Sequence, residues 1–270
     1  MRCRGGRKDC SRNRLPDRIL HECKITYTEP GMYHLHVPVE TPIEDNLNQE
    51  GFLGVDVGIR DAAKCFSPTG TVATFGSKDW IKTRIYHKLL EIDRWQSLRD
   101  KMMDDSDHVR SHILNHSKRK HLGRKQARIR RHVKETVRNL QWQAARWMCS
   151  RYKTVLVGKL RTSEIIRKIN RVFGRIPARI LNQLSHYTWQ RRMLEKAEET
   201  DCELRLVNER YTSKTCTRCG HIHRRLGGNK RYVCPNCGLR IDRDVNAARN
   251  MLLMHLALLR AVLRSRNAEA

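Results

Sequence analysis

Two Cys-x-x-Cys motifs near the carboxyl end constrain this chain more than any other feature. Their cysteines are Cys216, Cys219, Cys234 and Cys237. Fourteen residues separate the motifs, a spacing typical of a zinc ribbon, in which two tight turns bring four thiolates together. Gly220 and Gly238 follow the motifs, as such turns prefer. Because four cysteine ligands leave no open coordination position, we predict one structural Zn²⁺.

The charge of the chain points to a polyanionic partner. Lys and Arg number 55 against 28 Asp and Glu, which gives a net charge of +27 and a pI near 10.3. Because neutralising phosphates releases counterions, a protein this basic is expected to bind nucleic acid, although a ribosomal-type or membrane-surface protein would carry similar charge. The apolar segments are short and interrupted by charge, which predicts no transmembrane span, and no signal peptide is expected. Six further cysteines are scattered, as in a protein of a reducing intracellular compartment.

The amino-terminal part of the chain has little helical character. Residues 1–18 form a basic arm that we expect to be flexible, either a solvated tail or a segment for nucleic-acid binding or nuclear import. Residues 23–37 alternate β-rich positions on both sides of the turn Glu29-Pro30-Gly31, which predicts a β-hairpin. An acidic, polar linker is expected over residues 38–50.

The rest of the chain alternates strand and helix patterns. Short β-rich runs predict an antiparallel three-strand meander, and two later apolar runs predict further strands. The predicted strands are residues 52–57, 62–66, 71–75, 154–157 and 203–207. Helical periodicity covers residues 81–150, with a break at the acidic residues 104–107, then 177–199, and finally the segment from Asp244 onward. This order is typical of a ribonuclease-H-type α/β layer.

Apolar residues at helical spacing mark the faces that we expect to be buried. In the first helical region they are Leu89, Ile92, Trp95, Leu98, Ile129, Val133, Val137, Leu140, Ala144 and Trp147. In the two later helices they are Ile180, Leu184, Tyr187, Leu194, Ala247, Met251, Leu252, His255 and Leu258. Trp95 and Trp147 are therefore expected to pack in the core rather than to stack on bases.

Nine cations stand at the entry to the second half of the helical region. They are Lys118, Arg119, Lys120, Arg124, Lys125, Arg128, Arg130, Arg131 and Lys134. A charged helix face is often only solvated. Here no acid separates the cations before Glu135, so they would repel one another, and we predict that they face phosphates.

Two acids stand at positions suited to metal chemistry. Asp56 lies near the end of the first meander strand, and Asp244 lies at the start of the last helix. Taken alone, Asp56 could simply end a strand, and Asp244 could be a helix N-cap. Phosphodiester hydrolysis in this layer type, however, uses carboxylates from the first strand and the last helix to hold two Mg²⁺ ions.

The motifs together resemble a known family. GVDVG around Asp56, YTSKTC at residues 211–216, the cysteine motifs and DRDVNAARN at residues 242–250 resemble the RuvC-type nuclease core of TnpB proteins. These are transposon-encoded, RNA-guided DNA endonucleases related to type V CRISPR effectors and to the eukaryotic Fanzor proteins. The resemblance implies that Asp56 is the first catalytic acid and Asp244 the third. Asp242 is not expected to be a ligand.

The chain departs from the family at the second catalytic acid. TnpB proteins place a Glu after the strand that corresponds to residues 154–157, where this chain has Gly158 and Lys159. Fanzor-like members carry a substitute Glu just before YTSKTC, and Glu209 stands at that position. A strand at residues 203–207 that runs parallel beside residues 154–157 would bring Glu209 to the same ions. The alternative is that Glu209 is an ordinary loop acid and the enzyme is inactive.

The chain also departs from the family in size. The predicted hairpin resembles the closing strands of the family's wedge barrel, but the first half of the barrel and the helical recognition domain are absent from the sequence. The resemblance divides the chain into five parts. Residues 1–18 are the arm, residues 19–50 are a partial wedge region with the linker, and residues 51–210 are a RuvC-like core with a helical insertion at 81–150. Residues 211–240 are the zinc ribbon, and residues 241–270 contain the last acid and the terminal helix. Guide and target binding would then fall to the basic helix, the ribbon and Tyr211.

The sequence therefore predicts an α/β, RNase H-like (RuvC) endonuclease that uses Mg²⁺ and a guide RNA to cleave target DNA. Asp56, Glu209 and Asp244 would hold the two ions. The alternatives are a nuclease-dead, RNA-guided DNA-binding repressor, or a degenerate transposon remnant that binds nucleic acid. The oligomeric state stays open, and the missing recognition domain allows more than a monomer. An intracellular location is expected, in the nucleus if the protein is eukaryotic and Fanzor-like.

Overall fold

The computed structural model describes residues 15–28, 32–40, 42–43, 50–104, 109–160, 162 and 174–269. The chain divides into two compact units, one up to Pro42 and one from Ile43 onward. Most of the predicted arm and linker lies outside the described residues, as does the hairpin turn. No helix among the described residues is both long and apolar enough to cross a membrane.

The first unit contains the predicted β-hairpin. Strands β1 (Lys24–Thr28) and β2 (Met32–His36) pair antiparallel. Tyr27 lies opposite Tyr33 in this register, and the centroids of the two rings are 5.1 Å apart. The hairpin is confirmed, whereas its relation to a wedge barrel stays a prediction.

The second unit is built on a five-stranded mixed sheet, which confirms the predicted α/β class. Its strands are β3 (Glu50–Val57), β4 (Ala63–Phe66), β5 (Val72–Phe75), β6 (Tyr152–Gly158) and β7 (Glu203–Val207). Their order across the sheet is β5-β4-β3-β6-β7, with an antiparallel meander followed by two parallel pairings. Both the meander and the parallel placement of β7 beside β6 are confirmed.

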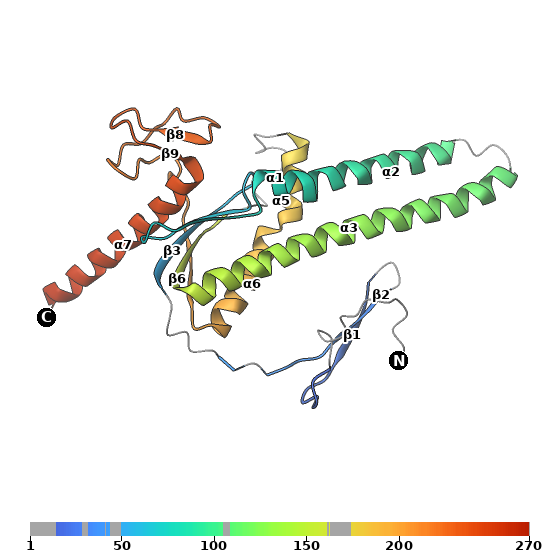
Figure 1. Ribbon diagram of the computed structural model, residues 1–270, viewed down its shortest axis with the longest axis horizontal. Helices are drawn as coiled ribbons and strands as arrows, with labels where there is room; N and C mark the ends of the chain where they lie inside the picture. Colours follow the sequence, from blue (N-terminus) through green and yellow to red (C-terminus); the bar gives the residue numbers. More distant parts are fainter. Residues whose placement is uncertain are drawn as a thin grey trace. The chain divides into compact units, whose positions relative to one another are not determined.

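A long helical arm follows the meander. It consists of α1 (Lys78–Ile81), the π-helical turn η2 (Lys82–Tyr86), α2 (His87–Asp104) and α3 (Val109–Arg151). Helices α2 and α3 lie side by side and extend away from the sheet (Figure 1). Buried Gln126 joins them, because its Nε2 donates to the Ile92 carbonyl at 3.0 Å and its Oε1 accepts from Arg99 at 2.8 Å. The residues of the predicted break beyond Asp104 lie outside the described part of the chain.

The helix predicted over residues 177–199 is wrong as a single element, because it is two helices. Helix α5 (Arg175–Leu184) and helix α6 (His186–Glu199) meet at Ser185, which adopts a left-handed conformation with φ 45°. Gln141 of α3 stabilises the break, since its Nε2 donates to the freed Leu184 carbonyl at 2.6 Å.

The break also changes which face of the second helix is buried. The prediction placed Tyr187 and Leu194 in the core, but Tyr187 is 72% exposed and Leu194 is 38% exposed. Instead, α6 buries His186, Trp189, Met193 and Ala197. The turn at Ser185 resets the helical phase, so apolar spacing counted across it predicts the wrong face.

The terminal helix α7 (Arg243–Glu269) begins where Asp244 predicts and packs on β3 and β4. The packing is closest at Gly54, where a Cβ would lie 2.3 Å from the carbonyl oxygen of Ala248. Any other residue at position 54 would push the helix off the sheet. The buried face of α7 does not reach Leu258, because His255 is buried whereas Leu258 is 65% exposed. The prediction that Leu258 is buried is therefore wrong.

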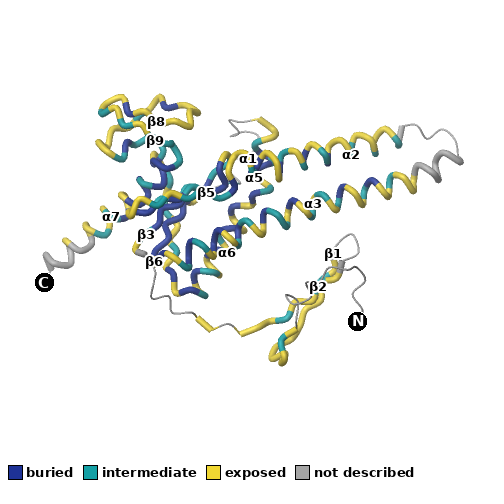
Figure 2. Tube along the Cα trace, in the orientation of Figure 1, coloured by how far each residue is buried: buried dark blue, intermediate teal, exposed yellow. Residues whose placement is uncertain are grey.

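Between β7 and α7 lies a small module with its own core. Strands β8 (Arg231–Val233) and β9 (Arg240–Asp242) pair antiparallel, and buried Tyr232 packs with Leu226 and the cysteines. Figure 2 shows that most of this module is exposed, whereas buried residues concentrate in the sheet and in the adjoining end of α3.

The buried His186 predicts a pH dependence of stability. Its Nε2 lies 3.2 Å from the Gly58 carbonyl, and burial lowers its pKa to about 4. Between this value and the unfolded pKa of about 6.5, the unfolded chain binds more protons, so acidification favours unfolding. When the pH falls from about 7 to about 5, we expect the free energy of unfolding of the parent to drop by about 2 kcal/mol more than that of His186→Gln.

Urea unfolding at the two pH values measures this difference. His132→Gln is the control, because His132 is exposed on α3. Equal pH dependence in the parent and His186→Gln would contradict the prediction.

Candidate functional site

Three acids that are far apart in the sequence meet at one edge of the sheet. Strands β3, β6 and β7 are parallel, so their carboxyl ends share this edge. Asp56 is the next-to-last residue of β3, and Glu209 lies two residues after β7. Asp244 comes to the same edge on the first turn of α7.

The contact at Gly54 explains the meeting of Asp56 with α7. Gly54 and Asp56 lie on the same face of β3, because side chains alternate along a strand. Ala248 and Asp244 lie one turn apart on the same face of α7. The close approach of Gly54 to Ala248 therefore carries Asp244 toward Asp56.

The acids interact electrostatically. Burial raises the pKa of Asp56 well above its usual range, and Glu209 and Asp244 raise it further. Burial likewise raises the pKa of Asp244, with added repulsion from Asp242 and Asp61. Crowded carboxylates of this kind are stabilised by a proton or a bound cation.

Glu209 occupies the space beside Gly158. A Cβ built on Gly158 would lie 1.9 Å from Glu209 Oε1 and 2.6 Å from its Cγ, so a side chain at position 158 and the present Glu209 exclude each other. The Oε1 atom is buried and has no hydrogen-bond partner among the described residues. Burial raises the pKa of Glu209 to about 7. This buried, unpartnered carboxylate oxygen belongs to a residue that interacts electrostatically with Asp56, and it is a suitable ligand for a hard cation such as Mg²⁺. The oxygens of Asp56, Glu209 and Asp244 do not all lie within 4.8 Å of one another.

Asp242 rather than Asp244 caps the terminal helix. Its Oδ1 accepts the backbone N–H groups of Asp244 at 2.9 Å and Val245 at 3.2 Å. The cap leaves the Asp244 carboxylate available at the site. This removes the alternative interpretation of Asp244 as an N-cap.

Two asparagines of DRDVNAARN tie the helix to the loop that follows Glu209. The side-chain amides of Asn246 and Asn250, one turn apart and buried, each donate to the Thr215 carbonyl at 2.7 Å. Asn250 also donates to the Thr212 carbonyl at 2.7 Å. The loop is thereby held against α7, a role that the sequence analysis did not assign to these residues.

Asp61 and Lys230 belong to the site and were missed by the sequence analysis. Asp61 is only 5% exposed, and it accepts from the Lys78 backbone N–H at 3.1 Å and from Lys230 Nζ at 3.0 Å. Lys230 comes from the cysteine module and also lies 4.0 Å from Asp242. A loop acid and a loop lysine carry no pattern in the sequence that would pair them.

The four cysteines form the predicted cluster. Their Sγ atoms all lie within 4.8 Å of one another, and no other group of three or more possible ligands among the described residues is so close. Cys216 and Cys237 are 3.6 Å apart at Sγ, as are Cys219 and Cys234. Thiolates around a tetrahedral zinc would lie about 3.8 Å apart.

The turns of the cluster favour thiolates. Gly220 and Gly238 have φ 74° and 69°, the left-handed conformation expected after each motif. A hydrogen bond from Asn236 Nδ2 lowers the pKa of the Cys219 thiol to about 6. Four sulfurs this close together can hold Zn²⁺.

The predicted nucleic-acid-binding residues lie on α3, apart from Tyr211. Lys118, Lys120, Arg124, Lys125 and Arg128 are exposed, and Arg119 and Arg131 are half-buried. Lys125 Nζ also lies 4.2 Å from the centroid of the Trp95 ring. Tyr211 is 50% exposed and has φ 64°. Tyr211 thus lies on a different part of the chain from the cations of α3.

Known proteins are similar to this chain over different parts of its length. The family model of the Cas12f1-like TNB domain matches residues 186–251. A TnpB-like protein, L79 of Acanthamoeba polyphaga mimivirus, is 28% identical over 226 residues, or 83% of this chain and 41% of the relative. The chain belongs to the TnpB family.

Two further matches come from CRISPR systems. The CRISPR-associated endodeoxyribonuclease Cas12f1 of Sulfoacidibacillus thermotolerans is 32% identical to this TnpB family member over 83 residues, 30% of the chain and 19% of the relative. A CRISPR-Cas12f ternary complex is similar in fold, with a TM-score of 0.52, 19% identity, and coverage of 85% of this chain and 44% of that one. The chain thus spans less than half the length of these relatives.

Removing one cysteine tests the metal cluster. We expect the parent to contain about one zinc per chain and Cys216→Ser to lose it together with the fold of the module, because structural zinc supplies folding free energy. Metal analysis and circular dichroism of the purified proteins measure both. His221→Ala should keep its zinc, and normal zinc content in Cys216→Ser would contradict the prediction.

Removing the Lys230 ammonium tests the link between the module and the sheet. Lys230→Met leaves the buried Asp61 carboxylate without this partner, which should lower the free energy of unfolding. We expect a loss of only about 1–2 kcal/mol, because Lys230 itself is partly exposed. Urea unfolding measures it. Lys230→Arg should recover most of the loss. If Lys230→Met has the same free energy of unfolding as the parent, the ion pair contributes nothing to stability.

Proposed function

We propose that this TnpB family member is a RuvC-type, Mg²⁺-dependent DNA endonuclease that acts with a guide RNA. The observation that carries the proposal is the complementarity of Gly158 and Glu209. Glu209 fills the space that a side chain at position 158 would occupy. On this proposal, the glutamate that TnpB proteins carry after the strand corresponding to β6 would be replaced by Glu209 from the loop after β7, and the overlap at Gly158 supports this.

The chain's own residues would perform three tasks at this site. Asp56, Glu209 and Asp244 would hold two Mg²⁺ ions, with Asp56 and Asp244 set by the β3–α7 packing. When bound, such ions activate water and stabilise charge on the scissile phosphate and the leaving oxygen. Asp242 would keep the start of α7 in place, because it caps the helix. Partial burial of the acids would strengthen their attraction for the ions.

Binding of the polynucleotides would fall to basic surfaces. The exposed cations of α3 are suited to grip a backbone by charge and shape rather than by base sequence. Tyr211, half-exposed beside Arg210 with 5.3 Å between the guanidinium and the ring, could stack on a base. The partners that we propose are a guide RNA and a target DNA.

Exchanging the two positions tests the proposal. Glu209→Gly should lower Mg²⁺-dependent plasmid cleavage about 100-fold or more, because it removes one of three ligands. Gly158→Glu combined with Glu209→Gly should restore part of it. Gly158→Ala alone should also lower activity, because its Cβ would displace Glu209. Cleavage is measured with the RNA that co-purifies with the protein.

Matched controls separate this effect from general damage. Gly51→Ala, at a strand glycine of β3 with nothing within 4 Å of a new Cβ, should keep full activity. Asp244→Ala should be inactive. Full activity of Glu209→Gly would overturn the role of Glu209, and RNA-dependent DNA binding without any cleavage by the parent would favour a nuclease-dead repressor.

A further inference from the structure

A pocket opens between α2, α3 and α5 and shares no residue with the carboxylate site. Its volume is about 470 Å³. Leu89 and Ile92 of α2, which are 6% and 5% exposed, give it an apolar floor. Volumes of this size suit an organic ligand, whereas a lone inorganic ion would leave most of the space empty.

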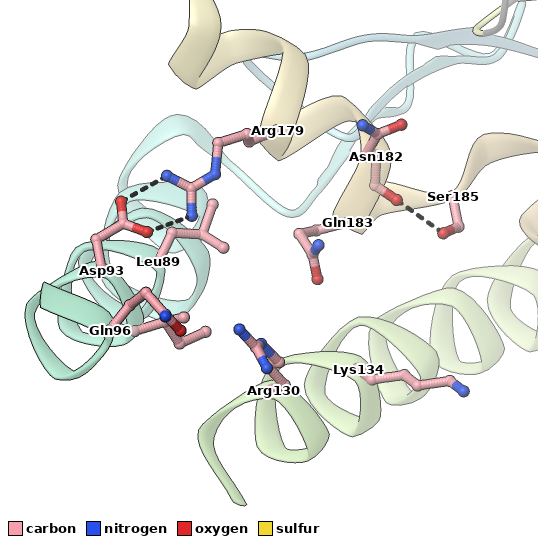
Figure 3. Close-up of a pocket in the computed structure, with 10 residues that line it drawn as sticks. Leu89, Asp93, Gln96, Arg130, Lys134, Arg179, Asn182, Gln183 and Ser185 are labelled. Carbon is pink, nitrogen blue, oxygen red and sulfur yellow. Dashed lines mark hydrogen bonds and ion pairs between the residues drawn. The ribbon is translucent and has the colours of Figure 1, made fainter. Parts of the chain in front are cut away.

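One wall of the pocket is a rigid, neutral pair. Arg179 of α5 donates twice to Asp93 of α2, with Nη1–Oδ2 at 2.6 Å and Nη2–Oδ1 at 2.9 Å (Figure 3). This hydrogen bonding lowers the pKa of Asp93, so the carboxylate stays ionised and cancels the guanidinium charge. Two parallel bonds also fix the guanidinium plane, and a fixed plane of this kind can stack against a base.

The opposite wall carries two cations, of which Arg130 helps to lower the pKa of Asp93 across the pocket. Arg130 and Lys134 lie one turn apart on α3, and neither forms an ion pair with a described residue. They leave the lining with a net positive charge. Arg130 extends from α3 into the gap between the helices, toward Gln183 of α5 (Figure 3). Gln183 has no hydrogen-bond partner among the described residues and offers both a donor and an acceptor.

We propose that this pocket binds one unpaired nucleotide. The base would lie on Leu89 and Ile92 beside the Arg179 plane, with its edge on the Gln183 amide. The phosphate would lie on Arg130, and Lys134, which extends along α3 away from Arg130, would meet the next phosphate of a strand (Figure 3). Each part of a nucleotide meets a matching surface: an apolar floor, a planar cation, a bidentate amide and two cations. An apolar drug-like ligand would not use the cations, and a bare phosphate would not use the floor.

The nucleotide could belong to a single-stranded RNA or be a free mononucleotide. The pocket lies beside the run of cations on α3, which favours a strand whose neighbouring phosphates extend along the helix. The inference concerns binding alone and does not depend on cleavage. The pocket proposal can therefore fail while the proposed nuclease activity stands. Equally, the nuclease proposal can fail while the pocket binds a nucleotide.

Binding of a labelled ten-nucleotide single-stranded RNA to the full chain, without added Mg²⁺, tests the pocket. Gln183→Leu keeps the charge and approximate size and should weaken binding about fivefold, because one hydrogen-bonded edge is lost. Arg130→Gln should weaken it about tenfold through loss of a charge-assisted contact. On fully paired RNA, which offers no free base edge, Gln183→Leu should not weaken binding.

Arg146→Gln is the matched control, because Arg146 is an exposed cation on α3 that does not line the pocket. It should weaken binding about twofold at most, through net charge alone. Displacement of the RNA by millimolar uridine or adenosine monophosphate would assign the pocket to a free nucleotide instead of a strand. Unchanged affinity of Gln183→Leu, with Arg130→Gln no weaker than Arg146→Gln, would overturn the proposal.

Discussion

The close packing of α7 on β3 is the contact on which the carboxylate site depends. Gly54 lets the Ala248 backbone come within the distance at which any Cβ would collide. That contact fixes the height of the helix above the sheet and so the separation of Asp56 from Asp244. Both acids are thus positioned by a residue that has no side chain and takes no part in chemistry.

The cysteine module and the Glu209 loop are joined to this frame by directed polar bonds. Buried amides of Asn246 and Asn250 hold the loop to α7, and Lys230 reaches back to the buried Asp61. Each bond satisfies a group that would otherwise be costly to bury. The net effect is that a small module with a core of its own is held in a fixed position relative to the acids.

The elements that could be predicted from the sequence are those whose signal is local. The β3–β5 meander, the cysteine turns and the start of α7 depend on nearby turn residues and on periodicity. The break at Ser185 could not be predicted, because it is stabilised by Gln141 from another helix. Asp61 and Lys230 were missed for the same reason, since their pairing joins distant loops. Gly158 shows a second kind of limit. The sequence shows only a glycine where TnpB proteins carry an acid, and the structure shows that the Glu209 side chain fills the space beside it.

That space restricts how the two arrangements of glutamate could have interconverted. A glutamate at position 158 and the present rotamer of Glu209 cannot coexist, because the first Cβ would overlap the second carboxylate. Gaining the loop glutamate before losing the strand glutamate gives a collision, and losing it first gives a site one acid short. If Glu209 has taken the role of a strand glutamate, either order passes through an intermediate with a collision or with one acid too few. Each substitution then depends on the other, and a stepwise reversal would pass through the same intermediates.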